Sequence, residues 1–412
     1  MQDSSVKPWL YCLETVNCFA PRILAASTAA ARPAGRPIPA MEALRPFELH
    51  VPAADLDDLQ ARLDRVRWPD EAPDAPWAYG TSLGFMQDLV AHWRQRHDWR
   101  AVEARLNAWP QFKTRIDGID VHFLHVPGRG SAARPLLLSH GWPGSVLEFV
   151  KLIPLLSDAG FTLVVPSLPG YTLSFEPGQP RRSLPQIGAM FDTLMRERLG
   201  YARYGAQGGD WGSFVTAWLG ANRAPHLAGI HLNLMPLRRD AAMFANPTDA
   251  ERRYLGELEQ WLKEETGYQA IQGTRPQTLA YGLSDSPVGL AAWIAEKYRA
   301  WTDCGGDPRG ALTLDEMLDN IGLYWFTNCI GASFWPYYAR LHGPWPIDGT
   351  IAVPTGYCEF PREILRPPRE SAARVFTDIR RWSVMPRGGH FAAMEQPQAL
   401  AAEITGFFDG LL

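Results

Sequence analysis

A short turn rich in glycine, placed directly after a strand-like run, constrains this 412-residue chain more than any other feature. The run covers residues 201–206, and the turn reads GGDWG over residues 208–212. Small residues on both sides of a central side chain are typical of a sharp strand-to-helix turn that exposes this side chain at the edge of a sheet. Here it is Asp210, whose carboxylate can attack a saturated carbon and leave an ester on the protein. Glycine and aspartate also make ordinary turns, so the pentapeptide alone identifies no site.

A second segment lies upstream and joins another apolar run to a loop. Residues 134–139 read RPLLLS, and HGWPGS follows over residues 140–145. A loop in this position can direct a backbone N–H toward the exposed turn. The N–H groups of Trp142 and Trp211 would then form an oxyanion hole with two donors. We expect His140 to shape the loop rather than to transfer protons.

The third segment lies near the C-terminus. Residues 380–385 read as a strand, and PRGGHF follows over residues 386–391. A histidine in a glycine-rich loop after the last strand is the expected base when the chain order is nucleophile, acid, histidine. A single loop histidine would mean little, but His390 follows a strand at the expected end of the fold. The sequence therefore pairs His390 with Asp210.

HGWPGS, GGDWG and RGGHFAAMEQP together resemble the epoxide hydrolases of the α/β-hydrolase fold. More narrowly, the chain resembles the microsomal and juvenile-hormone epoxide hydrolase branch, which has an additional N-terminal domain. The resemblance extends from about Met41 to the C-terminus. It implies hydrolysis of an apolar epoxide to a vicinal diol without a metal or an organic cofactor. The mammalian proteins of this branch have a membrane anchor, whereas residues 9–26 here are too short and too often interrupted by polar residues to be one.

The order of strand-like and helical patterns predicts the same fold class without the resemblance. Helical patterns alternate with strand-like runs at residues 135–139, 162–166, 201–206, 229–234, 350–354 and 382–385. Alternation of this kind implies a mostly parallel sheet flanked by helices. Ligands then bind beyond the carboxyl ends of the strands, where all three motifs fall.

Composition and pattern divide the chain into five segments. The first, rich in alanine, proline and arginine, is expected to be a disordered extension. The second is expected to pack on the core and the lid. In order, the segments are an extension (1–40), a helical N-terminal domain (41–109), the first part of the core (110–235), a helical lid (236–349) and the second part of the core (350–412).

Local signals support the helical segments. Apolar stripes at helical spacing cover residues 56–66, ended by Pro69, and residues 83–93. In the lid, two capping-box signatures begin helices; they are Thr248 with Glu251 and Thr313 with Glu316. The lid is also aromatic, and some of its tryptophans should line an apolar pocket; they are Trp261, Trp293, Trp301, Trp325 and Trp335.

Opening an epoxide produces an alkoxide, so the lid should supply a proton donor. A phenol suits this role because it stays protonated at neutral pH and donates as charge develops. The lid holds many tyrosines, and their pattern alone does not choose among them. The resemblance implies that Tyr268 in TGYQAIQ and Tyr337 in ASFWPYYARL bind the epoxide oxygen, with Tyr338 as a neighbouring competitor.

An acid that orients His390 should follow the strand expected at residues 350–354. The candidates are Glu359, Glu363, Glu370 and Asp378. The resemblance implies Glu363 in FPRE. A carboxylate there would hold His390 in the tautomer that accepts a proton and would stabilise the imidazolium.

These assignments imply a reaction in two steps. Tyr268 and Tyr337 bind the epoxide oxygen while Asp210 attacks a ring carbon. His390, oriented by Glu363, then activates the water that hydrolyses the ester. The N–H groups of Trp142 and Trp211 stabilise the oxyanion.

Composition limits the partners and the location. The net charge of −4 gives no reason to expect nucleic acid as a partner. Five cysteines without paired spacing indicate free thiols in a reducing compartment, so we expect a cytoplasmic protein. His122 and His125 would face opposite sides of a strand, so we expect no metal site there. A homo-oligomer is compatible with the sequence, and a role in detoxification or aromatic hydrocarbon catabolism is expected.

Two other functions remain open at this stage. A haloalkane dehalogenase would use the same ester chemistry, but a halide leaves without a proton and needs N–H donors such as Trp211 rather than phenols. A binding protein without activity could keep the pocket. The tyrosine pair argues against the first, and an intact set of Asp210, Glu363 and His390 argues against the second.

Overall fold

The computed structural model describes residues 43–412 apart from residue 74, residues 131–133 and residues 239–240. The extension predicted over residues 1–40 lies outside the described residues, as do Cys12 and Cys18. The described residues belong to one compact unit. The names N-terminal domain, core and lid therefore denote parts of this one unit, with the boundaries expected from the sequence.

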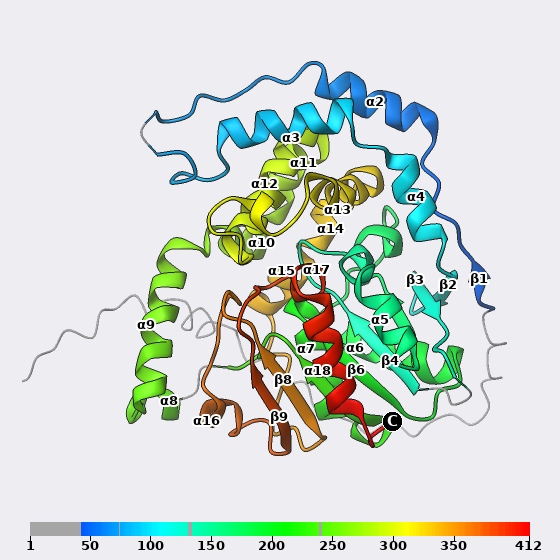
Figure 1. Ribbon diagram of the computed structural model, residues 1–412, viewed down its shortest axis with the longest axis vertical. Helices are drawn as coiled ribbons and strands as arrows, with labels where there is room; N and C mark the ends of the chain where they lie inside the picture. Colours follow the sequence, from blue (N-terminus) through cyan, green and yellow to red (C-terminus); the bar gives the residue numbers. More distant parts are fainter. Residues whose placement is uncertain (1–42, 74, 131–133, 239–240) are drawn as a thin grey trace, which may run out of the picture. The chain divides into compact units, whose positions relative to one another are not determined.

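A nine-stranded sheet forms the centre of the unit (Figure 1). Its strands follow the order β1-β2-β3-β5-β4-β6-β7-β8-β9. Pairing is antiparallel from β1 to β5 along this order and parallel from β5 to β9. The strands are β1 (Arg45–Pro46), β2 (Gln111–Ile116), β3 (Ile119–Val126), β4 (Arg134–Ser139), β5 (Phe161–Pro166), β6 (Tyr204–Gly208), β7 (Leu227–Leu232), β8 (Thr355–Glu359) and β9 (Ile379–Val384).

Helices lie between the strands along the chain and cover the sheet. They are α2 (Ala53–Leu63), α3 (Leu83–Gln95), α4 (Trp99–Asn107), α5 (Leu152–Asp158), α6 (Leu184–Thr193), α7 (Asp210–Asn222), α8 (Ala241–Ala245), α9 (Asp249–Glu264), α10 (Gly267–Thr274), α11 (Pro276–Asp285), α12 (Pro287–Trp301), α13 (Leu314–Thr327), α14 (Ile330–Ser333), α15 (Trp335–His342), α16 (Arg369–Ala372), α17 (Ala392–Glu395) and α18 (Pro397–Phe408). No helix in the described part of the chain combines the length and the apolar character needed to cross a bilayer.

The two faces of the sheet are buried by different helices. Successive side chains of a strand point to opposite faces. On β4, Leu137 belongs to the apolar cluster that includes α6 and α7, whereas Leu136 and Leu138 belong to the cluster that includes α5 and α18. The leucines at the centre of the strand are therefore buried on both faces, as expected for a strand covered on both sides.

The prediction of a strand at residues 350–354 is wrong, because the strand lies about one strand length later in the chain. The sheet instead uses β8, at Thr355–Glu359. Ile351 forms only an isolated bridge with Phe376, and the carbonyl of Pro354 accepts a hydrogen bond from the N–H of Ile230 before the regular ladder begins. Proline cannot donate to a ladder, so Pro354 is better placed before the strand than within it.

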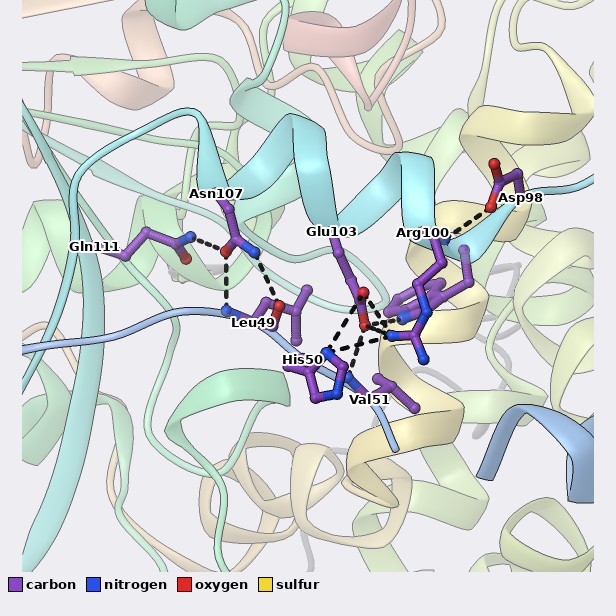
Figure 2. A network of polar contacts seen from close by, with 9 residues as sticks. Leu49, His50, Val51, Asp98, Arg100, Glu103, Asn107 and Gln111 are labelled. Carbon is purple, nitrogen blue, oxygen red and sulfur yellow. Dashed lines mark hydrogen bonds and ion pairs between the residues drawn. The ribbon is translucent and has the colours of Figure 1, made fainter. Parts of the chain in front are cut away.

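The extended segment at residues 49–51 is held by two polar side chains of α4 (Figure 2). Glu103 accepts a hydrogen bond of 2.6 Å from the N–H of Val51 and pairs with Arg100 at 2.7 Å. One turn later, Asn107 accepts from the N–H of Leu49 at 2.8 Å and donates to its carbonyl at 2.9 Å. These bonds satisfy backbone groups of an extended segment that has no strand partner at this point.

The N-terminal helices rest on the lid. In Figure 1, the blue and cyan helices α2 and α3 lie across the yellow lid helices, and both contact α12. The helical stripe predicted over residues 83–93 is confirmed as α3. The stripe predicted over residues 56–66 is longer than the helix, because α2 ends at Leu63 rather than near Pro69. Both capping boxes are confirmed, at the starts of α9 and α13.

We predict that Gly212→Ala destabilises the protein. A Cβ at this position would lie 1.9 Å from the carbonyl oxygen of Ser139, so α7 could not keep its approach to the end of β4. Overpacking of this kind typically costs about 1–3 kcal/mol. Thermal unfolding of Gly212→Ala should therefore occur at a lower temperature than that of the wild type.

Gly256→Ala is the matched control, because Gly256 lies in α9 and a Cβ there meets no atom within 4 Å. This change should stabilise the helix by roughly 0.5–1 kcal/mol. Equal thermal unfolding of Gly212→Ala and the wild type would contradict the close approach of α7 to β4.

Candidate active site

Asp210 lies where the sheet meets the first turn of a helix. β6 ends at Gly208 and α7 begins at Asp210, which has a φ of 46°. A residue other than glycine rarely adopts this left-handed conformation, and such strain is concentrated at functional sites. The sharp turn predicted from GGDWG therefore exists, and it places the carboxylate at the carboxyl edge of the parallel strands.

The loop after β4 contacts this carboxylate directly. The N–H of Trp142 donates to Oδ1 of Asp210 at 2.7 Å. A Cβ on Gly141 would lie 2.1 Å from the same oxygen, so only glycine leaves room for it. No bond from the N–H of Trp211 to Asp210 is present among the described hydrogen bonds. Trp142 therefore contacts the carboxylate in this geometry, and Trp211 does not donate to it.

His140 organises the loop rather than the site. Its Nε2 accepts from the N–H of Leu168 at 3.1 Å, so its Nδ1 is free to donate to the carbonyl of Gly141 at 3.0 Å. Burial lowers the pKa of His140 to about 4, although the Gly141 carbonyl and the Asp210 carboxylate act in the opposite direction. A neutral imidazole with both nitrogens engaged fits a structural role.

His390 lies between two carboxylates. Its Nδ1 is 2.6 Å from Oε1 of Glu363, and its Nε2 is 3.4 Å from Oδ2 of Asp210. Burial alone would lower the pKa of His390, but the carboxylates of Glu363 and Asp210 together raise it well above its usual value. The arrangement therefore stabilises an imidazolium in a site that solvent hardly reaches.

Of the candidate acids named from the sequence, Glu363 is the one bonded to His390. Its side chain is buried, and its Oε1 also accepts from the N–H of Ile364 at 2.6 Å. Glu370 instead accepts from Thr248, and Asp378 pairs with Arg380. Glu359 ends β8 and is half-buried, which raises its pKa.

The lid places two phenols against the tryptophans of the site. The rings of Tyr268 and Tyr337 have centroids 5.7 Å apart, and both side chains are buried. Tyr268 stacks on Trp142 at 5.4 Å, and Tyr337 meets Trp211 edge-on at 4.7 Å. Burial raises the pKa of both phenols, so both stay protonated at neutral pH.

Tyr338 lies in a different environment from Tyr337. It stacks on Trp335 at 5.0 Å and on His342 at 4.0 Å, and it is only half-buried. Successive residues of a helix point about 100° apart, so only one of the two tyrosines of α15 can face Asp210. The structure brings Tyr337, and not Tyr338, into the aromatic cluster of the site.

The remaining walls are apolar. Trp301 has its ring 5.3 Å from Tyr268 and 5.1 Å from His390, and Phe334 is 6.2 Å from Trp142. Of the five lid tryptophans named from the sequence, Trp301 is the one that contacts the site in this way. A site surrounded by such side chains favours apolar ligands that carry few polar groups. Within the described ranges, no cluster of His, Cys, Asp or Glu side chains could hold a metal ion.

Sequence reasoning missed three polar residues near Asp210. A cavity of about 20 Å³ beside Asp210 and His390 is also lined by Glu148, Gln207 and Asn233. Gln207 lies on β6, whereas Glu148 follows the loop after β4 and Asn233 follows β7. Each belongs to a different strand–loop unit, so no local pattern in the sequence associates them. The only signal is that Gln207 and Asn233 lie at the carboxyl ends of strands, whereas Glu148 lies several residues beyond the end of β4.

Comparison with known proteins assigns the chain to a family. Residues 44–149 match the family described as epoxide hydrolase N terminus, and residues 134–267 match the alpha/beta hydrolase fold. A protein of Stigmatella aurantiaca that carries an epoxide hydrolase name is 42% identical, over 89% of this chain and 84% of that protein. The chain belongs to the epoxide hydrolase family.

Other epoxide hydrolases agree with this assignment. Epoxide hydrolase 1 of Sus scrofa is 35% identical, over 92% of each chain. The crystal structure of juvenile hormone epoxide hydrolase from Bombyx mori superposes with a TM-score of 0.80 at 30% identity, over 90% of this chain and 95% of that one. The α/β-hydrolase fold and the family resemblance inferred from the three motifs are thereby confirmed.

We predict that Glu363→Gln lowers the pKa of His390. The Glu363 carboxylate favours the imidazolium, so its replacement by a neutral amide leaves burial, which lowers the pKa, less opposed. The change can be measured by following the ring signals of His390 by NMR as a function of pH. Glu359→Gln is the control, since Glu359 is a neighbouring acid that has no described contact with His390, and it should leave the pKa of His390 unchanged. An unchanged or higher pKa of His390 in Glu363→Gln would contradict this electrostatic coupling.

Proposed function

We propose that this epoxide hydrolase converts an apolar epoxide to a vicinal diol through a covalent ester on Asp210. The observation that carries the proposal is the surroundings of this one carboxylate. Its Oδ1 accepts from the N–H of Trp142, its Oδ2 faces His390, and the phenols of Tyr268 and Tyr337 lie in the same aromatic cluster. A nucleophile, a base and two acids are thus available in one water-poor site.

In the first step, the carboxylate of Asp210 attacks one carbon of the epoxide ring and the C–O bond of the ring breaks. The ring oxygen receives a proton from Tyr268 or Tyr337, which are expected to bind it before the attack. A phenol is a suitable donor because burial raises its pKa and so keeps it protonated at neutral pH, and it can donate as negative charge develops on the ring oxygen. The product of this step is a hydroxyalkyl ester of Asp210.

In the second step, water adds to the carboxyl carbon of the ester and His390 takes one of its protons through Nε2. Glu363 holds the ring through Nδ1 and stabilises the imidazolium that forms. The N–H of Trp142 supports the oxyanion, and we propose that the N–H of Trp211 joins it once the ester has formed. Collapse of the oxyanion breaks the bond to the alkyl oxygen, which takes the proton from His390 and leaves as the diol. The other proton of the water stays on the released carboxyl group of Asp210 and passes to the phenolate left by the first step, so that the carboxylate and the phenol are both restored.

The loss of charge on Asp210 in the first step changes the pKa of His390. The Asp210 carboxylate contributes to the raised pKa of His390. Esterification neutralises this carboxylate, so the pKa of His390 falls. The neutral form of His390, which can accept a proton, therefore becomes more abundant once the ester that must be hydrolysed has formed.

The lining of the site supports an apolar substrate such as a styrene-like, terpene-like or fatty epoxide. A role in detoxification or in the catabolism of aromatic hydrocarbons fits this substrate class. The described cysteines, Cys304, Cys329 and Cys358, are free and buried, which fits our proposal of a reducing, cytoplasmic location. Membership of the family argues against the haloalkane dehalogenase and the binding protein considered from the sequence.

We predict that His390→Gln accumulates the ester. The first step needs no base, whereas the second loses a group that typically contributes roughly 10²–10⁴-fold to the rate. Mass spectrometry of this variant after mixing with styrene oxide should show protein heavier by one substrate. Asp210→Asn in the same background is the control and should stay unmodified. Unmodified His390→Gln protein, with binding of the epoxide demonstrated, would refute the two-step scheme.

A further prediction concerns the two phenols. Tyr268→Phe and Tyr337→Phe should each slow the first step by about 2.7–4 kcal/mol, or roughly 10²–10³-fold, because one transition-state hydrogen bond is lost while the other remains. The double variant should form almost no ester, even in the His390→Gln background. Tyr338→Phe is the matched control and should change little. Ester formation at the original rate in the double variant would show that the proton donor lies elsewhere and would reopen the dehalogenase-like mechanism.

A further inference from the structure

The cavity beside Asp210 has the size and the lining of a site for a single water molecule. Its volume is about 20 Å³, and one water needs roughly 10–15 Å³ of such space together with polar partners. Asp210 and His390 contribute to one part of the lining, and Glu148, Gln207 and Asn233 contribute further polar side chains. A water in this cavity would be adjacent both to the carboxyl group it must attack and to the base that must take its proton.

Gln207 offers the cavity a hydrogen-bond acceptor, its side-chain oxygen Oε1. Its side chain is almost fully buried, and its Nε2 donates to Oδ1 of Asn233 at 2.8 Å. Its Oε1 has no hydrogen-bond partner among the described residues. A buried acceptor without a partner is costly, which makes a water in the cavity its natural donor.

The sequence around Glu148 is arranged to bring its carboxyl group to the loop that holds Trp142. A Cβ on Gly144 would lie 1.3 Å from Oε1 of Glu148, so the second glycine of HGWPGS leaves the space that this oxygen occupies. Glu148 itself lies in the short 3₁₀ helix η2 (Val146–Phe149), next to the loop. Any larger residue at position 144 would push the Glu148 carboxyl away from its place.

We propose that Glu148 and Gln207 hold the hydrolytic water against the Asp210 ester, with His390 as its base. The inference rests on the proposed function, because it assigns the water of the second step. The water oxygen bonds to the carboxyl carbon of Asp210, and one water proton passes to Nε2 of His390. The second proton stays hydrogen-bonded to Glu148 or to Oε1 of Gln207. The bond to the alkyl oxygen then breaks, and this oxygen receives the proton from His390.

Burial sets the charge state of Glu148. It raises the pKa of this carboxyl group to about 8, while His390 lowers the pKa and the Asp210 carboxylate raises it. At neutral pH the group is therefore present partly as a carboxylate, which accepts a hydrogen bond from water more strongly than the neutral acid does.

The test separates the two steps in single turnovers of the full chain with styrene oxide. Rapid quenching and mass spectrometry give the rates of ester formation and ester breakdown. In Glu148→Gln and in Gln207→Met, ester formation should keep the wild-type rate. Ester breakdown should slow by on the order of 10²-fold, the lower end of what a positioned acid or base contributes. The ester should consequently accumulate in both variants.

Glu359→Gln is the matched control, because Glu359 is a half-buried acid outside the lining of the cavity, and both of its rates should be those of the wild type. A purely structural role of Glu148 would displace the N–H of Trp142 and slow both steps together. If Glu148→Gln does not fold, Gln207→Met carries the test alone. Unchanged ester breakdown in either folded variant, or equal slowing of both steps, overturns the proposal. If the wild type itself forms no ester on Asp210, the proposed function fails instead.

Discussion

The hydrogen bond from the N–H of Trp142 to Asp210 is the contact on which the architecture of this site depends. It joins the loop after β4 to the turn after β6, two neighbouring parallel strands whose register ends at Ser139 and Gly208. The contact requires a left-handed Asp210 and a glycine at position 141, since a side chain there would occupy the place of the carboxylate. The packing of the sheet thus offsets the backbone strain at Asp210 and the lack of a side chain at Gly141.

Burial strengthens the electrostatic interactions between the charged groups of the site. Glu363 and His390 are almost inaccessible to solvent, so their interaction is screened far less than that of a surface ion pair. The loop of His390 is also tied to the lid, because the N–H of His390 donates to the carbonyl of Trp301 and the N–H of Gly388 donates to Asp303 at 3.0 Å. His390 is therefore positioned by the core and the lid together, and a movement of the lid would displace it.

The aromatic residues combine two physical roles. Trp142 and Trp211 fill the space between the sheet and the lid, and they hold Tyr268 and Tyr337 at fixed angles. The same rings exclude water from the carboxylate, which strengthens each polar contact that remains. A residual polar cavity next to Asp210 then stands out, because almost everything else around the carboxylate is apolar.

Much of this organisation could be predicted from the sequence because its signals are local. The turn at Asp210, the loop at Trp142, the helix α3 and both capping boxes depend on residues close together in the chain, and each was found in the structure. The strand expected at residues 350–354 was misplaced because a short apolar run resembles a strand, whereas one of the two strands that pair with Thr355–Glu359, β7, lies more than a hundred residues away in the chain.

By itself, the sequence determined the order of the elements and the chemical groups that reach the carboxyl edge of the sheet. The family resemblance implied Glu363 and Tyr337, but the residue patterns left their neighbours open. The tertiary structure brings Glu363, and not Glu359, to His390 and places Tyr337, and not Tyr338, beside Tyr268. It alone brought Glu148 and Gln207 to one cavity beside Asp210. The reason is physical: the direction of a side chain follows from local backbone geometry, but its neighbours are set by packing between segments that the sequence keeps far apart.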